Sequence, residues 1–305
     1  MNFINVENLS KNFGQFQALN DVSFSVKAGG SLAIIGPNGS GKTTLVRCLL
    51  GLLNASEGTA NIAGQPYDAG HPCTVGYLPE ERGNFQRDTP LDVLRLFGKL
   101  RGLTHHDASS QAYEYLDDVG LAPHARSPIQ TLSNGQQQKI HLGITFVGNP
   151  DLLVLDEPTR GFDPVNQAIF KTYLERHLLR GATLILVTNQ MHEVEELTNN
   201  VLFLRKGKQH FAGEVEEAKQ KLGGRRTALS YTGVLPPHAS EWNVEMPENG
   251  TLLLDSRHGI DSANQLLGRL LNSGVKVTDF STRLSSLDEI FVGVYGDSAQ
   301  LGSLN

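Results

Sequence analysis

The stretch that decides the fold reads Gly36-Pro37-Asn38-Gly39-Ser40-Gly41-Lys42-Thr43-Thr44. It fits the pattern of Gly, four residues and Gly-Lys-Ser/Thr, in which small residues let the backbone curl and aim its N–H groups at phosphate oxygens. An apolar run at 31–35 precedes it, and a helix predicted at 43–53 follows it. We therefore predict a phosphate-binding loop between a strand and a helix, in preference to a glycine-rich turn without a ligand.

Two side chains of this loop have roles of their own. Lys42 would reach the β- and γ-phosphates of a nucleotide, and the Thr43 hydroxyl would hold magnesium. The remaining residues would cradle the phosphates mainly through their backbone, and they are Gly36, Pro37, Asn38, Gly39, Ser40, Gly41 and Thr44.

Length and composition are those of an ordinary globular protein. The chain has 305 residues, 39% of them hydrophobic, which is enough for one large or two moderate domains. Its formal net charge of −6 argues against a general nucleic-acid binder, because basic side chains must neutralise a phosphate backbone. The only cysteines, Cys48 and Cys73, are too few for a disulfide framework and favour a reducing compartment.

No apolar run approaches the roughly 18 residues that can span a bilayer. Residues 1–7 lack the basic region and apolar core of a signal peptide. We therefore expect a cytosolic protein, or a cytosolic subunit that docks on something else.

The hydrophobic pattern predicts an α/β fold. Residues 1 to about 35 alternate like the strands of an antiparallel front end. Helical spacing fills roughly 90–147 and indicates an insertion between two parts of a nucleotide-binding core. The runs at 152–155 and 183–187 predict buried parallel strands, because continuous Leu, Ile and Val mark strands covered on both faces.

A second domain is expected where this pattern breaks, near 222–226. The chain after the break has a small α/β rhythm with Trp242, a strand at 251–254, a helix near 263–271 and a final helix after a Ser286 cap. The predicted domains are therefore 1–220, with a helical subdomain at about 85–148, and 225–298.

Asp156 and Glu157 directly follow the run at 152–155. A parallel strand would deliver both carboxylates to the sheet edge where α/β folds bind ligands. We predict that Asp156 holds the metal and that Glu157 polarises the attacking water, because phosphoryl transfer needs charge neutralisation and an oriented nucleophile.

Leu132-Ser133-Asn134-Gly135-Gln136 resembles the L-S-G-G-Q signature of ATP-binding-cassette (ABC) ATPases, and with the loop and acid pair the chain resembles the ATP-binding subunit of an ABC transporter. The resemblance implies a P-loop NTPase core, with ATP and Mg²⁺ as ligands. It also implies that Ser133, Gly135 and Gln136 of one copy face ATP held by another. Asn134 departs from the usual glycine, but asparagine, which can adopt the left-handed conformation, can hold a similar backbone shape.

Further positions fit the same resemblance. Phe13 matches the aromatic residue that stacks on adenine. Gly161-Phe162-Asp163-Pro164 resembles the loop that touches the facing copy, with Asp163 aimed at that copy's phosphate loop.

Two positions depart from the family pattern. Glu80 stands where glutamine is commonest, and as a carboxylate it can ligate magnesium or hold water but cannot donate a hydrogen bond. Asn189 stands where the family has a switch histidine, and an amide cannot carry a proton or a positive charge. His192, three residues on, is expected to be a solvent-facing residue on the first turn of a helix.

The glutamate-containing form at 77–83 and the extra C-terminal domain resemble sodium and drug efflux ATPases. The implied assembly is two copies of this chain beneath a separate membrane permease, on the inner face of the membrane, with no nucleic acid bound. Two alternatives stay open. One is a soluble ABC ATPase of translation or DNA repair, and the other is a regulatory ATP-binding subunit with little catalysis, which Asn189 suggests.

Overall fold

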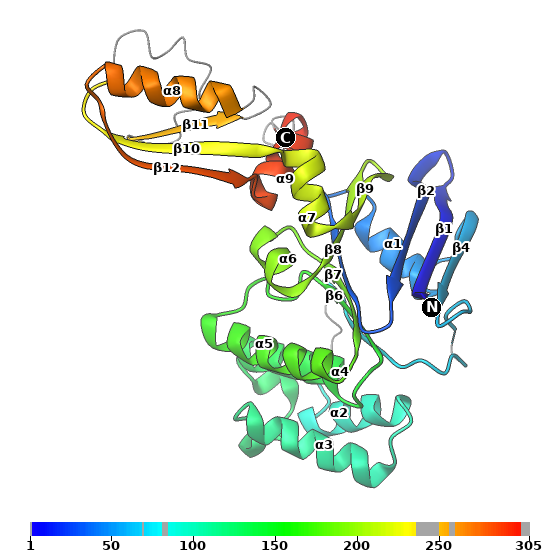
Figure 1. The fold of residues 1–305 in the computed structure, drawn as a ribbon. Coiled ribbons are helices and arrows are strands. Elements are labelled where there is room, and N and C mark those ends of the chain that lie inside the picture. The colour runs from blue at the N-terminus through cyan, green and yellow to red at the C-terminus, as the bar shows by residue number, and fades with distance from the viewer. Residues whose placement is uncertain (1, 69, 81–84, 236–249, 256–259, 300–305) are drawn as a thin grey trace. The chain divides into compact units, whose positions relative to one another are not determined.

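The computed structural model divides the chain into two compact units, residues 1–212 and residues 213–305 (Figure 1). The structure describes all residues except 1, 69, 81–84, 236–249, 256–259 and 300–305. Among the described residues, no helix is both long and apolar enough to cross a bilayer.

The first unit is built on a mixed sheet. Its strands are β1 Asn2–Phe13, β2 Phe16–Lys27, β3 Ser31–Ile35, β4 Glu57–Ile62, β5 Val75–Leu78, β6 Leu152–Asp156, β7 Thr183–Val187, β8 Asn200–Arg205 and β9 Lys208–Glu214. Their order across the sheet is β4-β1-β2-β9-β8-β3-β7-β6-β5. This arrangement confirms the expected α/β class with a mixed sheet.

The helices of this unit are α1 Lys42–Leu49, α2 Pro90–Leu100, α3 His105–Asp118, α4 Asn134–Phe146, α5 Pro164–Leu179 and α6 Met191–Leu197, with short 3-10 turns η1 Ala122–His124 and η2 Ile129–Thr131. Strand β5 pairs in parallel with β6, and α2, α3 and α4 lie between them in the sequence. The helices at 90–146 therefore interrupt the core sheet, as the helical spacing predicts.

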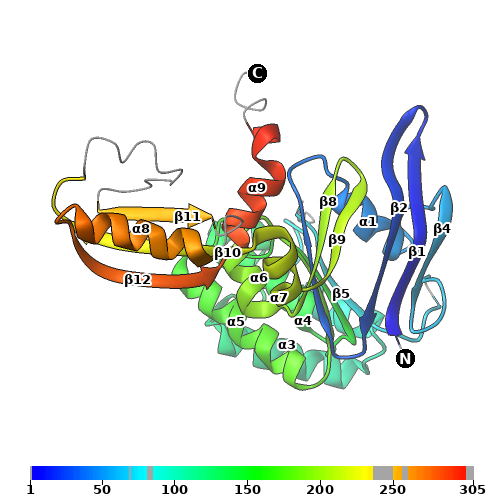
Figure 2. The ribbon, with the colours of Figure 1, turned by 45° about the horizontal axis from the view of Figure 1, so that its top comes forward.

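The core strands are buried on both faces, and alternate residues separate the two faces. Leu153 and Leu155 face a cluster with α4, α5 and the helical insertion. Leu152 and Val154 face a second cluster with α1 and the front strands. Figures 1 and 2 show α1 between the parallel core and the strands β1, β2 and β4. Such double coverage explains the unbroken apolar runs.

The antiparallel front end is shorter in sequence than expected. Strands β1 and β2 pair antiparallel, and β4 joins β1 antiparallel on its other side. The prediction for residues 1–35 is wrong for Ser31–Ile35, because β3 lies between β7 and β8 and pairs in parallel with both. Its five residues are all buried, as a central strand requires.

Helix α1 ends at Leu49, not near Leu53 as the apolar spacing suggests. Gly51 follows the C-cap with φ of 63°, a left-handed conformation that terminates a helix. The amide of Leu52 donates to the Arg47 carbonyl at 2.9 Å, which completes the cap. A Cβ at Gly51 would lie 2.3 Å from the Tyr67 carbonyl oxygen, so glycine is required there.

The second unit contains α7 Val215–Ala218, the π-turn η3 Lys219–Gly223, β10 Arg225–Thr232, β11 Thr251–Asp255, α8 Ile260–Asn272, β12 Lys276–Leu284 and α9 Leu287–Ala299. Its sheet has the order β11-β10-β12, and both pairings are antiparallel. Leu229 and Leu252 of the sheet pack with Leu266 and Leu270 of α8. Trp242 lies outside the described residues.

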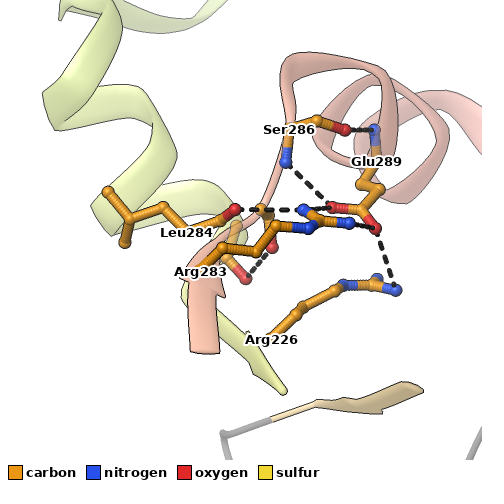
Figure 3. A network of polar contacts seen from close by, with 7 residues as sticks. Arg226, Arg283, Leu284, Ser286 and Glu289 are labelled. Carbon is orange, nitrogen blue, oxygen red and sulfur yellow. Dashed lines mark hydrogen bonds and ion pairs between the residues drawn. The ribbon is translucent and has the colours of Figure 1, made fainter. Parts of the chain in front are cut away.

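A charged cluster closes the junction of β12 and α9 (Figure 3). The Arg283 guanidinium donates to both oxygens of Glu289 at 2.8 Å, and the Arg226 Nη1 lies 3.8 Å from Glu289 Oε1. Ser286 caps α9, since its N–H donates to Glu289 at 2.8 Å and its Oγ accepts from the Glu289 N–H at 3.3 Å. This is the capped helix start predicted at Ser286.

Candidate nucleotide site

A cavity of about 610 Å³ opens at the carboxyl ends of the core strands. Most of the predicted phosphate loop lines it, together with both residues of the acid pair. The lining residues are Phe16, Ala18, Asn38, Gly39, Ser40, Gly41, Lys42, Thr43, Thr44, Glu80, Asp156, Glu157, Arg160 and Asn189. The first two residues of the predicted loop, Gly36 and Pro37, do not belong to this lining.

The loop backbone leaves no room for larger side chains at two glycines. A Cβ at Gly36 would lie 2.4 Å from the Leu204 carbonyl oxygen and 2.5 Å from Ser40 Oγ. At Gly41, where φ is 106°, it would lie 2.7 Å from the Ala18 carbonyl oxygen. The Ser40 Oγ is buried and has no hydrogen-bond partner among the described residues. These features fit a loop shaped around a phosphate group.

Lys42 folds back over its own loop. Its Nζ donates to the Gly36 carbonyl at 2.6 Å and to the Pro37 carbonyl at 3.2 Å. Burial lowers the pKa of Lys42, and the nearby carboxylates of Glu157, Asp156 and Glu80 oppose that shift. Phosphate oxygens could replace the two carbonyls as acceptors, because an ammonium group has three rotatable donors.

Strand β6 brings Asp156 to the loop. Thr43 Oγ1 donates to Asp156 Oδ2 at 3.3 Å, although the two residues are 113 positions apart. Burial, followed by the charge of Glu80, raises the pKa of Asp156 to about 6. A hydroxyl and a carboxylate oxygen at this spacing are hard oxygen ligands, which Mg²⁺ prefers alongside phosphate oxygens and water.

Glu157 is held in an unusual backbone conformation. Its φ is 47°, in the left-handed region that non-glycine residues rarely adopt. Two bonds hold it there, since its N–H donates to the Val187 carbonyl at 2.8 Å and its Oε1 accepts from the Asn189 N–H at 3.1 Å. Burial raises the pKa of Glu157, while the charge of Lys42 lowers it. A desolvated, oriented carboxylate is suited to polarise water.

Glu80 also lines the cavity. Its Oε1 forms an ion pair with Arg160, which belongs to the loop that follows the acid pair. The cavity thus contains a carboxylate held by a guanidinium at the position where the family pattern has an amide. Arg160 carries no motif of its own, and only its proximity in sequence to Glu157 could have indicated it.

The signature residues Ser133, Gly135 and Gln136 do not reach this cavity. Ser133 caps α4: its Oγ accepts from the Gln136 N–H at 3.3 Å, and its own N–H donates to Gln136 Oε1 at 2.9 Å. Ser133 is exposed, so its hydroxyl remains accessible from outside the chain. Signature residues outside their own copy's cavity are consistent with a role toward a second copy.

Asn134 tolerates the position of the usual glycine without adopting a left-handed conformation. Asn134 is the first residue of α4 and has no positive φ, because Ser133 is the N-cap and the next position is already helical. Asparagine in place of glycine therefore needs no special backbone conformation. Gly135 lies beside the loop that leads into α5, since a Cβ there would be 3.9 Å from Asp163 Oδ2. Asp163 caps α5 by accepting from the Asn166 N–H at 2.7 Å.

Phe13 and Phe16 occupy the two ends of the β1–β2 hairpin turn and pair with each other. Phe16 lines the cavity and is 66% exposed, whereas Phe13 is 47% exposed, lies outside the lining and carries Lys11 Nζ 5.0 Å from its ring centre. Phe16 and Ala18 are therefore cavity residues that sequence reasoning missed. Phe16 could have been found because it is an aromatic residue only three positions after Phe13, the predicted adenine-stacking residue.

His192 is exposed and lies on the first turn of α6, as expected. The same turn contains Glu193, which is buried, and the sequence pattern did not distinguish the two.

A glycine-rich loop at the start of α1, a core of parallel strands within a mixed sheet and an acid pair beside the loop define a P-loop nucleoside triphosphatase. Comparison with known proteins shows to which family of P-loop nucleoside triphosphatases the chain belongs. Residues 19–160 match the sequence model of the ABC transporter family. An uncharacterized ABC transporter ATP-binding protein of Methanocaldococcus jannaschii is 35% identical over 219 residues, 72% of this chain and 80% of that protein.

The Nod factor export ATP-binding protein I of Burkholderia lata is 33% identical, over 67% of this chain and 68% of its own length. A solved structure described as the ATP-binding subunit of an ABC transporter superposes with a TM-score of 0.67 at 25% identity, and covers 72% of this chain and 92% of its own. The chain belongs to the ATP-binding subunits of ABC transporters.

Proposed function

We propose that this chain is the ATP-hydrolysing subunit of an exporter, and that it acts as a pair of copies on a separate membrane permease. The observation that carries the proposal is the 3.3 Å bond between Thr43 and Asp156, because it joins the phosphate loop to the acid pair at one cavity. A triphosphate in this cavity would meet loop amides, the Lys42 ammonium and the Thr43 hydroxyl.

Within one copy, each residue of the cavity has a defined task. Lys42 and the amides of residues 38–43 bind the β- and γ-phosphates. Thr43 and Asp156 would hold Mg²⁺, which neutralises phosphate charge when bound. The negative charge of Glu80 is near enough to raise the pKa of Asp156. Glu157 orients the attacking water. The Asn189 side chain donates a hydrogen bond to the γ-phosphate.

The second copy supplies the other half of the site. The signature residues Ser133, Gly135 and Gln136 lie outside the cavity of their own chain. An exposed serine beside the N-terminus of α4 is suited to bind the γ-phosphate of ATP held by the facing copy, because helix N-termini attract anions. Asp163 would face the partner's phosphate loop. Phe13, beside the hairpin turn, would stack on adenine together with Phe16.

Export rests on the similarity to the Nod factor export protein and on the glutamate-containing segment that includes Glu80. A separate permease is expected because the ATP-binding subunits of this family pair with transmembrane subunits. The pair of copies would sit on the cytoplasmic face of the membrane and change the permease's shape as ATP binding closes the pair and hydrolysis releases it.

A mixing experiment tests the shared site. In one variant, Lys42→Ala removes the ammonium group that binds the phosphates. In the other, Ser133→Arg prevents the signature residues from contacting ATP on the facing copy. Each variant alone should lack ATPase activity, whereas the mixture should recover part of it, because mixed pairs contain one intact site. A mixture as inactive as its components would exclude a site shared between two copies.

The nature of the catalysis is tested with Glu157→Gln. This variant should bind ATP with wild-type affinity and lose nearly all hydrolysis, while the exposed control Glu114→Gln on α3 should not change either property. Wild-type hydrolysis no faster than that of Glu157→Gln would favour the regulatory alternative. Purification of the tagged chain from its own cells separates the remaining alternatives: a membrane protein as partner supports transport, and ribosomes or DNA contradict it.

A further inference from the structure

Glu193 is a buried carboxylate that the proposed chemistry does not use. It lies on the first turn of α6 and is only 4% exposed. Burying a carboxylate is unfavourable unless hydrogen bonds compensate for lost water. The Thr188 hydroxyl donates to its Oε2 at 2.8 Å, and the Thr159 hydroxyl donates to its Oε1.

Both hydroxyls also accept hydrogen bonds from one residue, Gln190. The Gln190 backbone N–H donates to Thr188 Oγ1 at 3.1 Å, and its side-chain Nε2 donates to Thr159 Oγ1 at 3.1 Å. The four bonds therefore form a closed ring, in which Gln190 donates to both threonines and both threonines donate to Glu193. We call these four residues the Glu193 ring.

The direction of the two threonine hydrogen bonds to position 193 depends on a carboxylate there. Each threonine has one hydroxyl proton, and both protons point to Glu193, which leaves the oxygen lone pairs free to accept from Gln190. An ionised carboxylate only accepts, so it can receive both protons at once. An amide at this position would present a donor to one threonine and reverse that bond.

The ring connects the two segments that carry the proposed catalytic groups. Thr159 lies two residues after Glu157, and Thr188 lies one residue before Asn189. The same segments meet again through the 3.1 Å bond from the Asn189 N–H to Glu157 Oε1. Because Glu157 has a strained backbone with φ of 47°, its geometry depends on such neighbouring contacts.

We propose that Glu193 is a positioning residue, which holds the Glu157 segment and the Asn189 segment in register through the Glu193 ring. The proposal rests on the proposed ATPase function for its kinetic consequence. Its structural consequence, that both segments loosen together when Glu193 is lost, is independent of that function.

The test compares Glu193→Ala with Glu196→Gln in the full chain. Glu196 lies on the same helix but is exposed and pairs with Lys171, so it controls for altered charge on α6. Glu193→Ala should lower kcat for ATP at least tenfold and leave the ATP dissociation constant within twofold, because the phosphate loop is not part of the ring. Glu196→Gln should behave as wild type.

A conservative pair tests the hydroxyl itself. Thr188→Val keeps the shape of the side chain but removes the proton and the lone pairs, so kcat should fall as in Glu193→Ala. Thr188→Ser should restore most of the lost rate. The double variant Glu193→Ala with Thr188→Val should be no slower than the slower single variant, since both changes break one ring.

Hydrogen exchange distinguishes this proposal from the function on which it rests. In Glu193→Ala, backbone amides in both 157–160 and 187–190 should exchange faster, whether or not the chain hydrolyses ATP. Faster exchange confined to α6, or an unchanged kcat in an active protein, would overturn the positioning role. Failure of the wild type to hydrolyse ATP would overturn the proposed function alone, and the exchange data would still decide on the ring.

Discussion

The Asn189 backbone N–H donates to the Glu157 side chain at 3.1 Å, so the residue at the switch position contacts the proposed water-orienting carboxylate through its main chain. Any residue except proline at 189 could make that bond. Asn189 also lines the cavity, and replacing its side chain leaves that main-chain bond in place. Orientation of Glu157 and the charge at the switch position can therefore be changed separately.

Asn189→His should raise kcat for ATP several-fold. Histidine can carry a positive charge toward the γ-phosphate, whereas an amide cannot, and the main-chain bond to Glu157 is kept. Steady-state ATPase measurements at saturating ATP check this expectation. Asn189→Ala is the matched control and should lower kcat, because it also keeps the main-chain bond but removes the side-chain donor. No gain in the histidine variant would show that Asn189 does not limit turnover.

Gly36→Ala should abolish measurable ATP binding. Its Cβ would lie 2.4 Å from the Leu204 carbonyl and 2.5 Å from Ser40 Oγ, so the loop must move. Gly64→Ala controls for glycine replacement elsewhere: its φ is 90° but nothing lies within 4 Å, so it should cost only about 1 kcal/mol of stability and leave ATP affinity unchanged. Calorimetric titration with ATP measures the affinity of each variant. Equal ATP affinities in Gly36→Ala and Gly64→Ala would refute a tightly shaped loop.

Arg101→Met should destabilise the first unit by about 2–4 kcal/mol. The Arg101 guanidinium donates to the carbonyls of Val75, Ile144 and Val147, which ties β5 to the end of α4, and its loss leaves three acceptors unsatisfied. Burial lowers the pKa of Arg101 to about 10, so the group stays charged at neutral pH.

Urea unfolding of the full chain measures the free-energy difference for Arg101→Met. Arg101→Lys should fall between the wild type and Arg101→Met, because a single ammonium cannot reproduce the planar fork of donors. A lysine variant as unstable as the methionine variant would show that charge alone contributes nothing there.

The Glu289 cluster should make the second unit sensitive to acid. The Arg283 hydrogen bonds lower the pKa of Glu289 below its ordinary value of 4.5. A depressed carboxylate pKa stabilises the folded state above the unfolded-state value, and this contribution disappears as pH falls through the lower, folded-state value.

Glu289→Gln should therefore cost about 1 kcal/mol at pH 7, and the difference from wild type should shrink steadily below about pH 4.5. Denaturant unfolding at pH 7, and at several values below 4.5, gives the comparison. A difference that stays constant across this range would exclude ionisation of Glu289 as its source.

Much of the core was predictable because its signals are local. The phosphate loop needs a strand before it and a helix after it, and both lie within a few residues of Gly36 and Thr44. The acid pair follows its strand directly. The helical insertion was predictable from the spacing of apolar residues alone. Errors arose where a long-range contact decided the outcome, as for the end of α1, where Gly51 packs against the Tyr67 carbonyl, and for the parallel pairing of β3.

By itself, the sequence determined the class of the fold, the phosphate loop and the identity of the residues at its acid pair and switch position, since these are properties of short stretches and of residue chemistry. Only the tertiary structure decided which side chains meet. It pairs Glu80 with Arg160, buries Glu193 between two threonines and leaves His192 beside it in solvent. Such contacts depend on how distant segments pack, and neighbouring positions on one helix turn can face opposite environments.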